Sequence, residues 1–479
     1  MKLIVQFTLF SMLTGCAVGP NYQQPTTGTA LPDHYQQVAG HEISTAANTD
    51  RWWLGFNDPA INQLVDAALQ RNLDLASADA NIRAARAQLN IIDSANQPQL
   101  NADGHISRDH FSKNSENFAN IPFPHPLTTF TDYRAGFDAS WEIDLFGQNK
   151  RSLEAAQARL AVIEHQRQGA ELRVAAEVVR NTIDYRAWQQ RVNNAQQIVD
   201  ADQQLLDLVL LQKQAGLMSD SDVIDAESSL HSATATLPTL QSAALASLMA
   251  ITVLVNQSQE QVSALLQTDA AIPVPPQHID ALGLPADLLL RRPDIQSAER
   301  TLAAATADIG VAVADQYPKI TLLAKGGLDS ISTGKFTDLA SQYWNLGPQI
   351  SLPLFSGGRL AAQVSAREAA RDAALAQYRQ TILAAFADTE TALIRYQREQ
   401  QRLEQIQAEY QTQQQQLKFA ELREQVGDTN HTPVLQARAR LAQLNDTQFA
   451  SQQALADDLT VLYKALGGGI AASGNAQSP

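Results

Sequence analysis

Two stretches of unusual length and composition dominate this 479-residue sequence. Residues 147–215 and 358–426 contain no proline, and Ala, Gln, Arg and Glu are the main residue types in both. At a rise of 1.5 Å per residue, either stretch would form a helix roughly 100 Å long. Helices of globular domains are far shorter than this. We therefore expect an elongated, largely helical fold.

Residues that would share one face of a helix recur along the second stretch at a spacing of three to four, with small or polar residues among them. The positions are Tyr378, Ile382, Ala385, Thr389, Ala392, Tyr396, Leu403 and Tyr410. A tight two-stranded coiled coil would favour Leu or Ile at such positions. The pattern instead indicates a wide tube of many helices packed side by side.

The chain repeats itself, because each long stretch follows a candidate strand pair and precedes a glycine turn and another helix. A proline-rich segment, residues 272–293, separates the two copies. We divide the chain into a signal peptide (1–15), an N-terminal tether (16–57), repeat 1 (58–256), a linker (257–284), repeat 2 (285–466) and a disordered tail (467–479). Within the repeats we expect a first helix from Pro59 to about Ser94 and strand pairs at about 98–145 and 318–355. Each strand pair is followed by a long helix, at 147–215 and 358–426. A further helix then follows in each repeat, at 221–256 and 433–466, with Ser221 and Thr432 as the expected N-caps.

The strand pairs alternate in polarity with a period of two. From Tyr133 to Ile143 apolar residues occupy every second position, and charged or small residues lie between them. This is typical either of a half-buried soluble sheet or of a membrane barrel with a wet lumen. Four strands cannot close a barrel, and open edges are not tolerated in lipid, so the barrel interpretation requires several copies of the chain. The alternative, a soluble coiled-coil lipoprotein with two small sheets, leaves the apolar strand faces without a function.

The only cysteine of the chain follows a short apolar segment that starts after Lys2. The sequence Leu13-Thr14-Gly15-Cys16 resembles a bacterial lipobox, in which the thiol receives a lipid and becomes the mature N-terminus. An ordinary signal peptide with a chance cysteine is the alternative. Ala17 stands where lipoproteins retained at the inner membrane typically carry Asp, so we expect the outer membrane. After Leu13 we expect no transmembrane helix.

Composition excludes several other classes of protein. A formal net charge of −15 and a pI near 5.0 argue against a nucleic-acid partner, which requires a basic surface. One cysteine cannot form an intramolecular disulfide. The nine histidines show no metal-ligand spacing, and no catalytic motif is present, so we expect no metal, no further cofactor and no enzymatic activity.

Four segments in order resemble TolC-like outer membrane efflux channels of the NodT-type lipoprotein branch. They are residues 16–22 (CAVGPNY), 52–59 (WWLGFNDP), 290–295 (LRRPDI) and 462–467 (LYKALG). The resemblance implies α-helical and transmembrane β structure: a homotrimer with a twelve-stranded outer-membrane β-barrel, four strands per chain, continued by a long α-helical periplasmic barrel. It also implies a diacylglycerol and an N-palmitoyl group on Cys16, a periplasmic membrane-fusion adaptor, an inner-membrane pump of the resistance-nodulation-division type, and contact with outer-membrane lipid.

The same resemblance implies two kinds of functional site. The helix-hairpin tips that would receive the adaptor correspond to Gly216, Leu217, Ser219, Gly427, Asp428 and Thr429; the alternative is that they are only well-formed turns, which the glycines would satisfy alone. The tunnel constriction corresponds to Asp220, Asp222, Asp225, Thr432 and Gln436. Gln436 departs from the acid usual in the family, which leaves the position of the gate open, and Asp222 could merely complement a helix dipole.

We therefore expect a passive exit duct of a tripartite efflux pump, carrying drugs or other small molecules from the adaptor and pump to the exterior. The alternatives are a duct for type I protein secretion and a non-channel periplasmic lipoprotein. The sequence does not identify the substrate, because a wide wet tunnel selects little. Arg291 and Arg292, beside a helix start, are expected to be structural.

Overall fold

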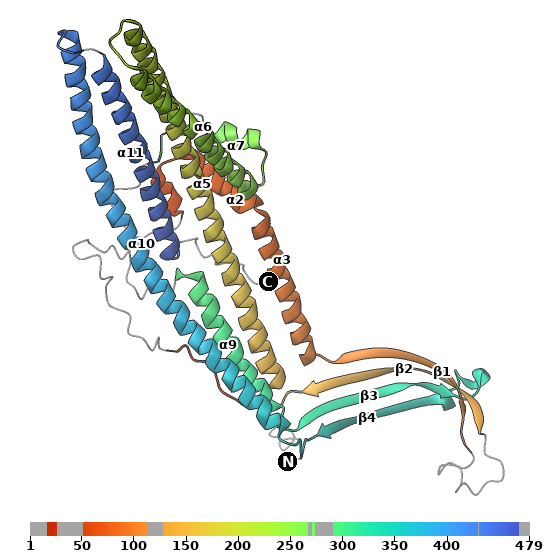
Figure 1. The fold of residues 1–479 in the computed structure, drawn as a ribbon. Helices are drawn as coiled ribbons and strands as arrows, with labels where there is room; N and C mark the ends of the chain where they lie inside the picture. Colours follow the sequence, from red (N-terminus) through yellow and green to blue (C-terminus); the bar gives the residue numbers. More distant parts are fainter. Residues whose placement is uncertain are drawn as a thin grey trace. The chain divides into compact units, whose positions relative to one another are not determined.

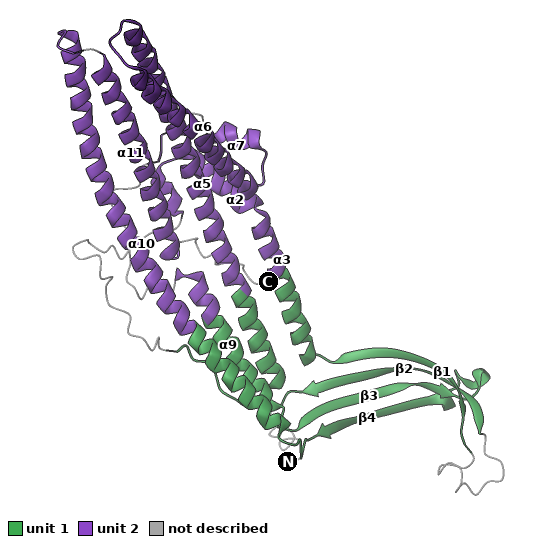
Figure 2. Cartoon of the chain, in the orientation of Figure 1, with its two compact units in different colours: residues 1–25, 83–162, 299–377 green, residues 26–82, 163–298, 378–479 purple. Residues whose placement is uncertain are grey.

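The fold is that of a computed structural model, which describes residues 17–25, 51–112, 128–266, 271–273, 291–429 and 431–468. The chain forms two compact units, each assembled from distant parts of the sequence (Figure 2). Unit 1 comprises residues 1–25, 83–162 and 299–377, and unit 2 comprises residues 26–82, 163–298 and 378–479. The expected signal peptide (1–15), Cys16 and the tail from residue 469 onward lie outside the described residues.

Unit 1 contains one antiparallel sheet of four strands in the order β1-β2-β3-β4 (Figure 1). The strands are β1 (Gln99–His110), β2 (Thr129–Ile143), β3 (Lys319–Ser330) and β4 (Gln342–Ser351), with short 3-10 turns at Thr333–Lys335 and Leu339–Ser341 between the last two. The two hairpins are joined through the pairing of β2 with β3, in which Gly136 opposes Gly327. Strands from both halves of the sequence therefore share one sheet.

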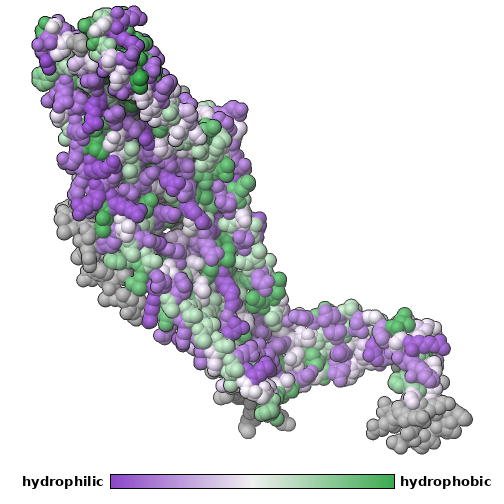
Figure 3. Space-filling model, viewed as in Figure 1, coloured by the Kyte–Doolittle hydropathy of each residue, from purple (hydrophilic) through white to green (hydrophobic). Residues whose placement is uncertain are grey.

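The strand register separates the sheet into an apolar and a polar face. In-register neighbours on one face include Leu100, Ala139, Ala324 and Leu346. The opposite face carries a cross-strand ion pair, in which Arg134 Nη2 lies 2.8 Å from Asp329 Oδ2. The apolar face is exposed in the single chain, with Trp344 at 81% and Leu346 at 64% exposure. Figure 3 shows hydrophobic and hydrophilic residues interspersed over the strands.

Two helices of 67 residues follow the hairpins: α5 (Gln148–Gln214) and α10 (Arg359–Gln425). Their bounds lie within one residue of the stretches expected from the absence of proline. The spaced residues of α10 from Tyr378 to Tyr396 are buried, which is the outcome that a close-packed helix array requires. The other helices are α2 (Pro59–Arg71), α3 (Leu73–Asp93), α6 (Asp220–Val255), α7 (Gln259–Leu266), α9 (Pro293–Ala314) and α11 (Thr432–Ala465), with 3-10 turns at Trp52–Phe56 (η1) and Ser94–Asn96.

The core of unit 2 corrects the extent of the expected tether (16–57). Trp52, Trp53 and Phe56 of η1 are almost fully buried, and Trp52 stacks on Tyr463 with ring centroids 5.2 Å apart. Large aromatic side chains bury much apolar surface, so residues 52–56 are part of the folded unit. Residues 17–25 also lie on folded structure, in unit 1.

Four further boundaries differ from expectation. The helix expected from Pro59 to Ser94 is interrupted at Asn72, whose side-chain oxygen accepts from the amides of Asp74 and Leu75 and restarts the helix. The expected linker contains α7. The N-cap of α6 is Ser219 and not Ser221, and that of α11 is His431 and not Thr432, which lies one residue inside the helix.

Among the described helices, α6 is long and apolar enough to cross a membrane by length and composition alone. Its buried residues include Leu248, Ile251 and Val255, which pack in the core of unit 2. Part of the apolar surface of α6 therefore packs within the chain, whereas Leu245 and Val253 are exposed.

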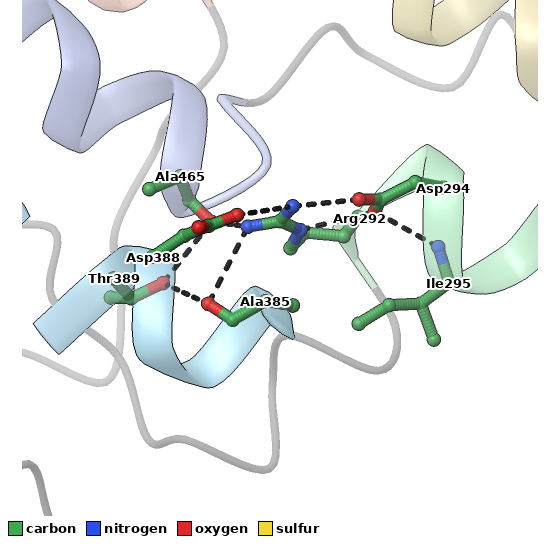
Figure 4. A network of polar contacts seen from close by, with 7 residues as sticks. All are labelled: Arg292, Asp294, Ile295, Ala385, Asp388, Thr389 and Ala465. Carbon is green, nitrogen blue, oxygen red and sulfur yellow. Dashed lines mark hydrogen bonds and ion pairs between the residues drawn. The ribbon is translucent and has the colours of Figure 1, made fainter. Parts of the chain in front are cut away.

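Arg292 ties three elements of unit 2 together at the start of α9 (Figure 4). Its guanidinium donates to the carbonyl oxygen of Ala465 at 3.0 Å, at the end of α11, and pairs with Asp294 at 2.6 Å. It also lies 3.5 Å from Asp388 on α10. The helix-end carbonyl of Ala465 would otherwise lack an intrahelical partner, so the arginine has a structural role.

Candidate channel and docking sites

The two helix hairpins end in turns of the same geometry. Gly216 and Gly427 both have positive φ, at 73° and 77°. In the first turn Gly216 N donates to Lys213 O and Leu217 N donates to Gln212 O, both at 2.9 Å. These two bonds define a Schellman motif, which requires a left-handed residue at the position that glycine occupies.

The second turn repeats this pattern in the other half of the sequence. Gly427 N donates to Glu424 O, and Asp428 N donates to Arg423 O, again at 2.9 Å. The Asp428 side chain also contacts the last turn of α10, where its Oδ2 accepts a hydrogen bond from Arg423 Nε at 2.7 Å. Thr429 is half-buried at the end of this turn. Two tips 211 residues apart in sequence therefore present equivalent backbones.

The first tip rests on a small apolar cluster, while its outermost side chains are exposed. Leu206, Val209, Val223 and Ala226 form the cluster between α5 and α6. Leu217 projects from the turn with 74% exposure.

Two of the acids expected at the constriction have local structural partners. Asp222 closes a capping box with Ser219, whose amide donates to Asp222 Oδ2 at 2.7 Å. These hydrogen bonds lower the pKa of Asp222. Asp220 lies 2.6 Å from Lys213 Nζ, and this contact lowers the pKa of Asp220.

The remaining constriction candidates are divided between the tips. Asp225 is exposed on α6. On α11, Thr432 is half-buried in the first turn and Gln436 is exposed one turn later. The structure thus groups Gly216, Leu217, Ser219, Asp220, Asp222 and Asp225 at one tip and Gly427, Asp428, Thr429, Thr432 and Gln436 at the other.

Sequence reasoning missed the polar contacts that join α5 to α11. Arg191 forms a bidentate ion pair with Asp446, in which Nε and Nη2 lie 2.7 and 3.0 Å from the two carboxylate oxygens. Next to it, Asn194 Nδ2 donates to Ala442 O at 2.7 Å. A cleft of about 400 Å³ beside them is lined by residues of α5, α10 and α11, including Tyr410 and Arg438. No local signal could have revealed these pairs, because the partners lie about 250 residues apart.

The described residues offer no metal site, since they contain no group of three His, Cys, Asp or Glu side chains placed to hold an ion. The polar contacts at the tips connect residues of the same hairpin.

Comparison with known proteins places these features in context. The family described as "Outer membrane efflux protein" matches residues 64–257 and 284–468. Nodulation protein T of Rhizobium leguminosarum bv. viciae is 31% identical over 464 residues, covering 96% of this chain and 92% of that protein. The pyoverdine export outer membrane protein OpmQ of Pseudomonas aeruginosa is 30% identical, with 96% of each chain covered.

Solved structures show the same fold. The outer-membrane channel OprN matches with a TM-score of 0.83 and 29% identity, over 95% of this chain and 99% of that one. The Campylobacter jejuni CmeC outer membrane channel gives a TM-score of 0.85 at 22% identity and covers 95% of both chains.

Proposed function

Because this chain belongs to the outer membrane efflux protein family, we propose that it is the outer-membrane exit channel of a tripartite efflux pump. It conducts small molecules passively from a periplasmic adaptor and an inner-membrane pump to the exterior. The observation that carries this proposal is the sheet, whose strands present exposed apolar residues on one face and charged residues on the other. Lipid would cover the first face and water the second.

We also propose a homotrimer, which the resemblance implies, whereas the number of strands requires only that several copies share one barrel. One chain contributes four described strands with open outer edges, and unpaired backbone groups are not tolerated in a bilayer. Three copies would supply twelve strands, within the range of known barrels. The long helices of the three copies would then form the periplasmic barrel of the expected fold.

We also propose that Cys16 carries diacylglycerol and an N-palmitoyl group, as its lipobox indicates. The protein would then be held in the outer membrane both by its strands and by lipid. No substrate is assigned, since the relatives carry unlike cargo by name: OpmQ exports pyoverdine and another relative, TtgC of Pseudomonas putida, is a toluene efflux protein.

Reconstitution in planar bilayers tests the channel function directly. We expect the detergent-purified trimer to produce discrete, persistent conductance steps, because its lumen would be wet and continuous. Bilayers treated with detergent alone are the control. A folded trimer that never conducts at any voltage would support the non-channel lipoprotein instead.

The two tips are proposed as the adaptor contact. Replacing Gly427 with Val should leave trimers intact but weaken coupling, because a β-branched residue resists the positive φ of this turn by about 1–2 kcal/mol. No atom lies within 4 Å of a Cβ built at Gly427, so the effect is one of backbone conformation and not of collision.

The measurement is site-specific crosslinking to the adaptor, together with drug resistance of the host cell. Gly427→Asn is the matched control, since Asn tolerates the left-handed region and should retain coupling. If Gly427→Val retained full crosslinking to the adaptor and full drug resistance, this tip would not be part of the adaptor contact.

The constriction is proposed to lie just past the tips, at Asp220, Asp222, Asp225, Thr432 and Gln436. Threefold symmetry would bring three copies of Asp225 around one axis and favour cations. Asp225→Asn should therefore reduce cation preference at low salt, and the difference should shrink at 1 M salt, where the Debye length is about 3 Å.

Single-channel reversal potentials measure this selectivity. Asp222→Asn is the comparison variant for these recordings. The Asp222 carboxylate belongs to the capping box of α6, so its loss should lower the free energy of unfolding. Wild-type selectivity of Asp225→Asn at low salt would show that this carboxylate faces away from the pore.

A further inference from the structure

Residues 17–22, which follow Cys16 directly, lie on the surface of unit 1 in contact with one buried arginine. Arg151 sits in the first turn of α5, and its side chain is only 3% exposed. Gly19, Pro20 and Asn21 of the segment remain exposed on their outer side. The segment is therefore docked on the unit and is not threaded through its core.

Two of the three guanidinium nitrogens of Arg151 donate to this segment. Nε donates to Val18 O at 3.1 Å, and Nη2 donates to Gly19 O at 3.3 Å and to Asn21 Oδ1 at 2.7 Å. Nη1 donates to Glu154 Oε2 at 2.7 Å, which fixes the orientation of the group. A planar fork of five donors can satisfy several acceptors at once, which a lysine ammonium cannot do in the same geometry.

Two glycines make this close approach possible. A Cβ on Gly310 of α9 would lie 2.7 Å from the Arg151 side chain, and a Cβ on Gly19 would lie 2.5 Å from Gly310 Cα. Gly19 also has a φ of +84°. The segment, the arginine and α9 therefore pack without space for an added methyl group at Gly19 or Gly310.

The two ends of the segment have their own contacts. Val18 N donates to Phe146 O at 3.0 Å, in the turn between β2 and α5. At the other end, Tyr22 Oη donates to the carboxylate of Glu299, a residue that is 6% exposed. The guanidinium of Arg300 lies over the Tyr22 ring, 5.9 Å from its centroid.

We propose that these contacts form a binding site for the chain's own mature N-terminus, with Arg151 as its positioning residue. The site binds Val18, Gly19, Asn21 and Tyr22, and it would hold the lipid-bearing end of the chain beside the β2–α5 turn. Because Cys16 directly precedes Ala17 in the chain, docking of residues 17–22 would hold the anchor near that turn. The anchoring role rests on the lipidation proposed above, whereas the docking itself rests on contacts between described residues.

Chymotrypsin provides the test, because it cleaves after Tyr22 only when that side chain leaves Glu299 and enters the protease. The assay uses the mature trimer in detergent and follows the chain that begins at Gln23 by intact mass. Cleavage of a docked segment tracks the population of its open state. We expect Arg151→Ala to be cut at Tyr22 about tenfold faster or more, since one charge-assisted hydrogen bond alone is worth a factor of that order.

Arg159→Ala is the matched control on the same helix. Arg159 is 54% exposed and pairs with Asp308 at 2.5 Å without touching the segment, so its loss should leave the Tyr22 rate unchanged. Gly19→Ala alters only the segment and should also be cut faster, which keeps the test valid if Arg151→Ala fails to assemble.

Wild-type cleavage rates in both Arg151→Ala and Gly19→Ala would overturn the proposal. So would an Arg159→Ala variant that is cut as fast as Arg151→Ala. The assay reads peptide-bond cleavage and not transport, so its failure is distinct from a failure of channel conductance.

Discussion

Replacing Gly327 with Val should reduce the amount of assembled channel by at least about tenfold, the largest effect expected of a single substitution in the sheet. Gly327 opposes Gly136 across the β2–β3 pair. A Cβ at Gly327 would lie 2.3 Å from Ala135 O and 2.5 Å from Gly136 Cα. These are backbone atoms, so the two strands must separate, and this pair joins the first hairpin to the second.

The measurement is the yield of heat-sensitive oligomer in outer-membrane fractions, analysed by gel mobility and size exclusion. Gly347→Val is the control, because Gly347 lies on the same face and a Cβ there meets no atom within 4 Å. Normal assembly of Gly327→Val would mean that the β2–β3 junction tolerates a wider spacing than the structure shows.

The second large effect is a pH dependence of the free energy of unfolding that arises from Asp457. Burial, reinforced by the nearby charge of Asp184, raises the pKa of Asp457 to about 8. Asp457 Oδ1 is buried without a hydrogen-bond partner among the described residues. The other charged groups around it are Glu177 and Arg180 on α5 and Asp458 on α11.

The sign of the effect follows from proton binding. Between about pH 4 and 8 the folded state holds a proton on Asp457 that the unfolded chain has released. The free energy of unfolding should therefore fall as pH rises, on the order of 1 kcal/mol per pH unit between pH 5 and 7. Asp457→Asn removes this dependence, so the variant should be more stable than wild type at pH 7–8 and show a flatter profile.

Thermal unfolding followed by circular dichroism between pH 5 and 8 measures the effect. Asp184→Asn should act in the same direction but less strongly, because it removes only the neighbouring charge. Asp446→Asn, on the same helix, should instead lower stability, since it breaks the pair with Arg191. If Asp457→Asn retained the wild-type slope, another group would be responsible for the pH dependence.

Periodicity made the secondary structure predictable. The alternation from Tyr133 to Ile143 identified β2, and the absence of proline located α5 and α10, because both signals are local. The comparisons confirm the resemblance to TolC-like channels of the NodT type. Gly216 and Gly427 also adopt the positive φ that a tight helix end demands.

What the sequence did not reveal depends on contacts between distant residues. Arg151 and Asn21 are 130 positions apart, and Arg292 and Ala465 are 173 apart, so no window of sequence contains both partners. The burial of Asp457 depends likewise on α5 packing against α11. The N-cap at Ser219 was missed for a local reason, because Ser219 and Ser221 both precede an acid and only the backbone conformation distinguishes them.

The order of the strands has a genetic consequence. Among the described strands, β1 and β4 form the two outer edges of the sheet, and they differ in sequence. If copies join edge to edge, β4 of one copy must meet β1 of the next, which is a head-to-tail contact that closes only as a ring. A chain with one blocked edge could still enter such a ring through its intact edge and prevent closure. Alleles that damage β1 or β4 alone should therefore be dominant over the wild-type gene, whereas alleles that prevent the whole sheet from folding should be recessive.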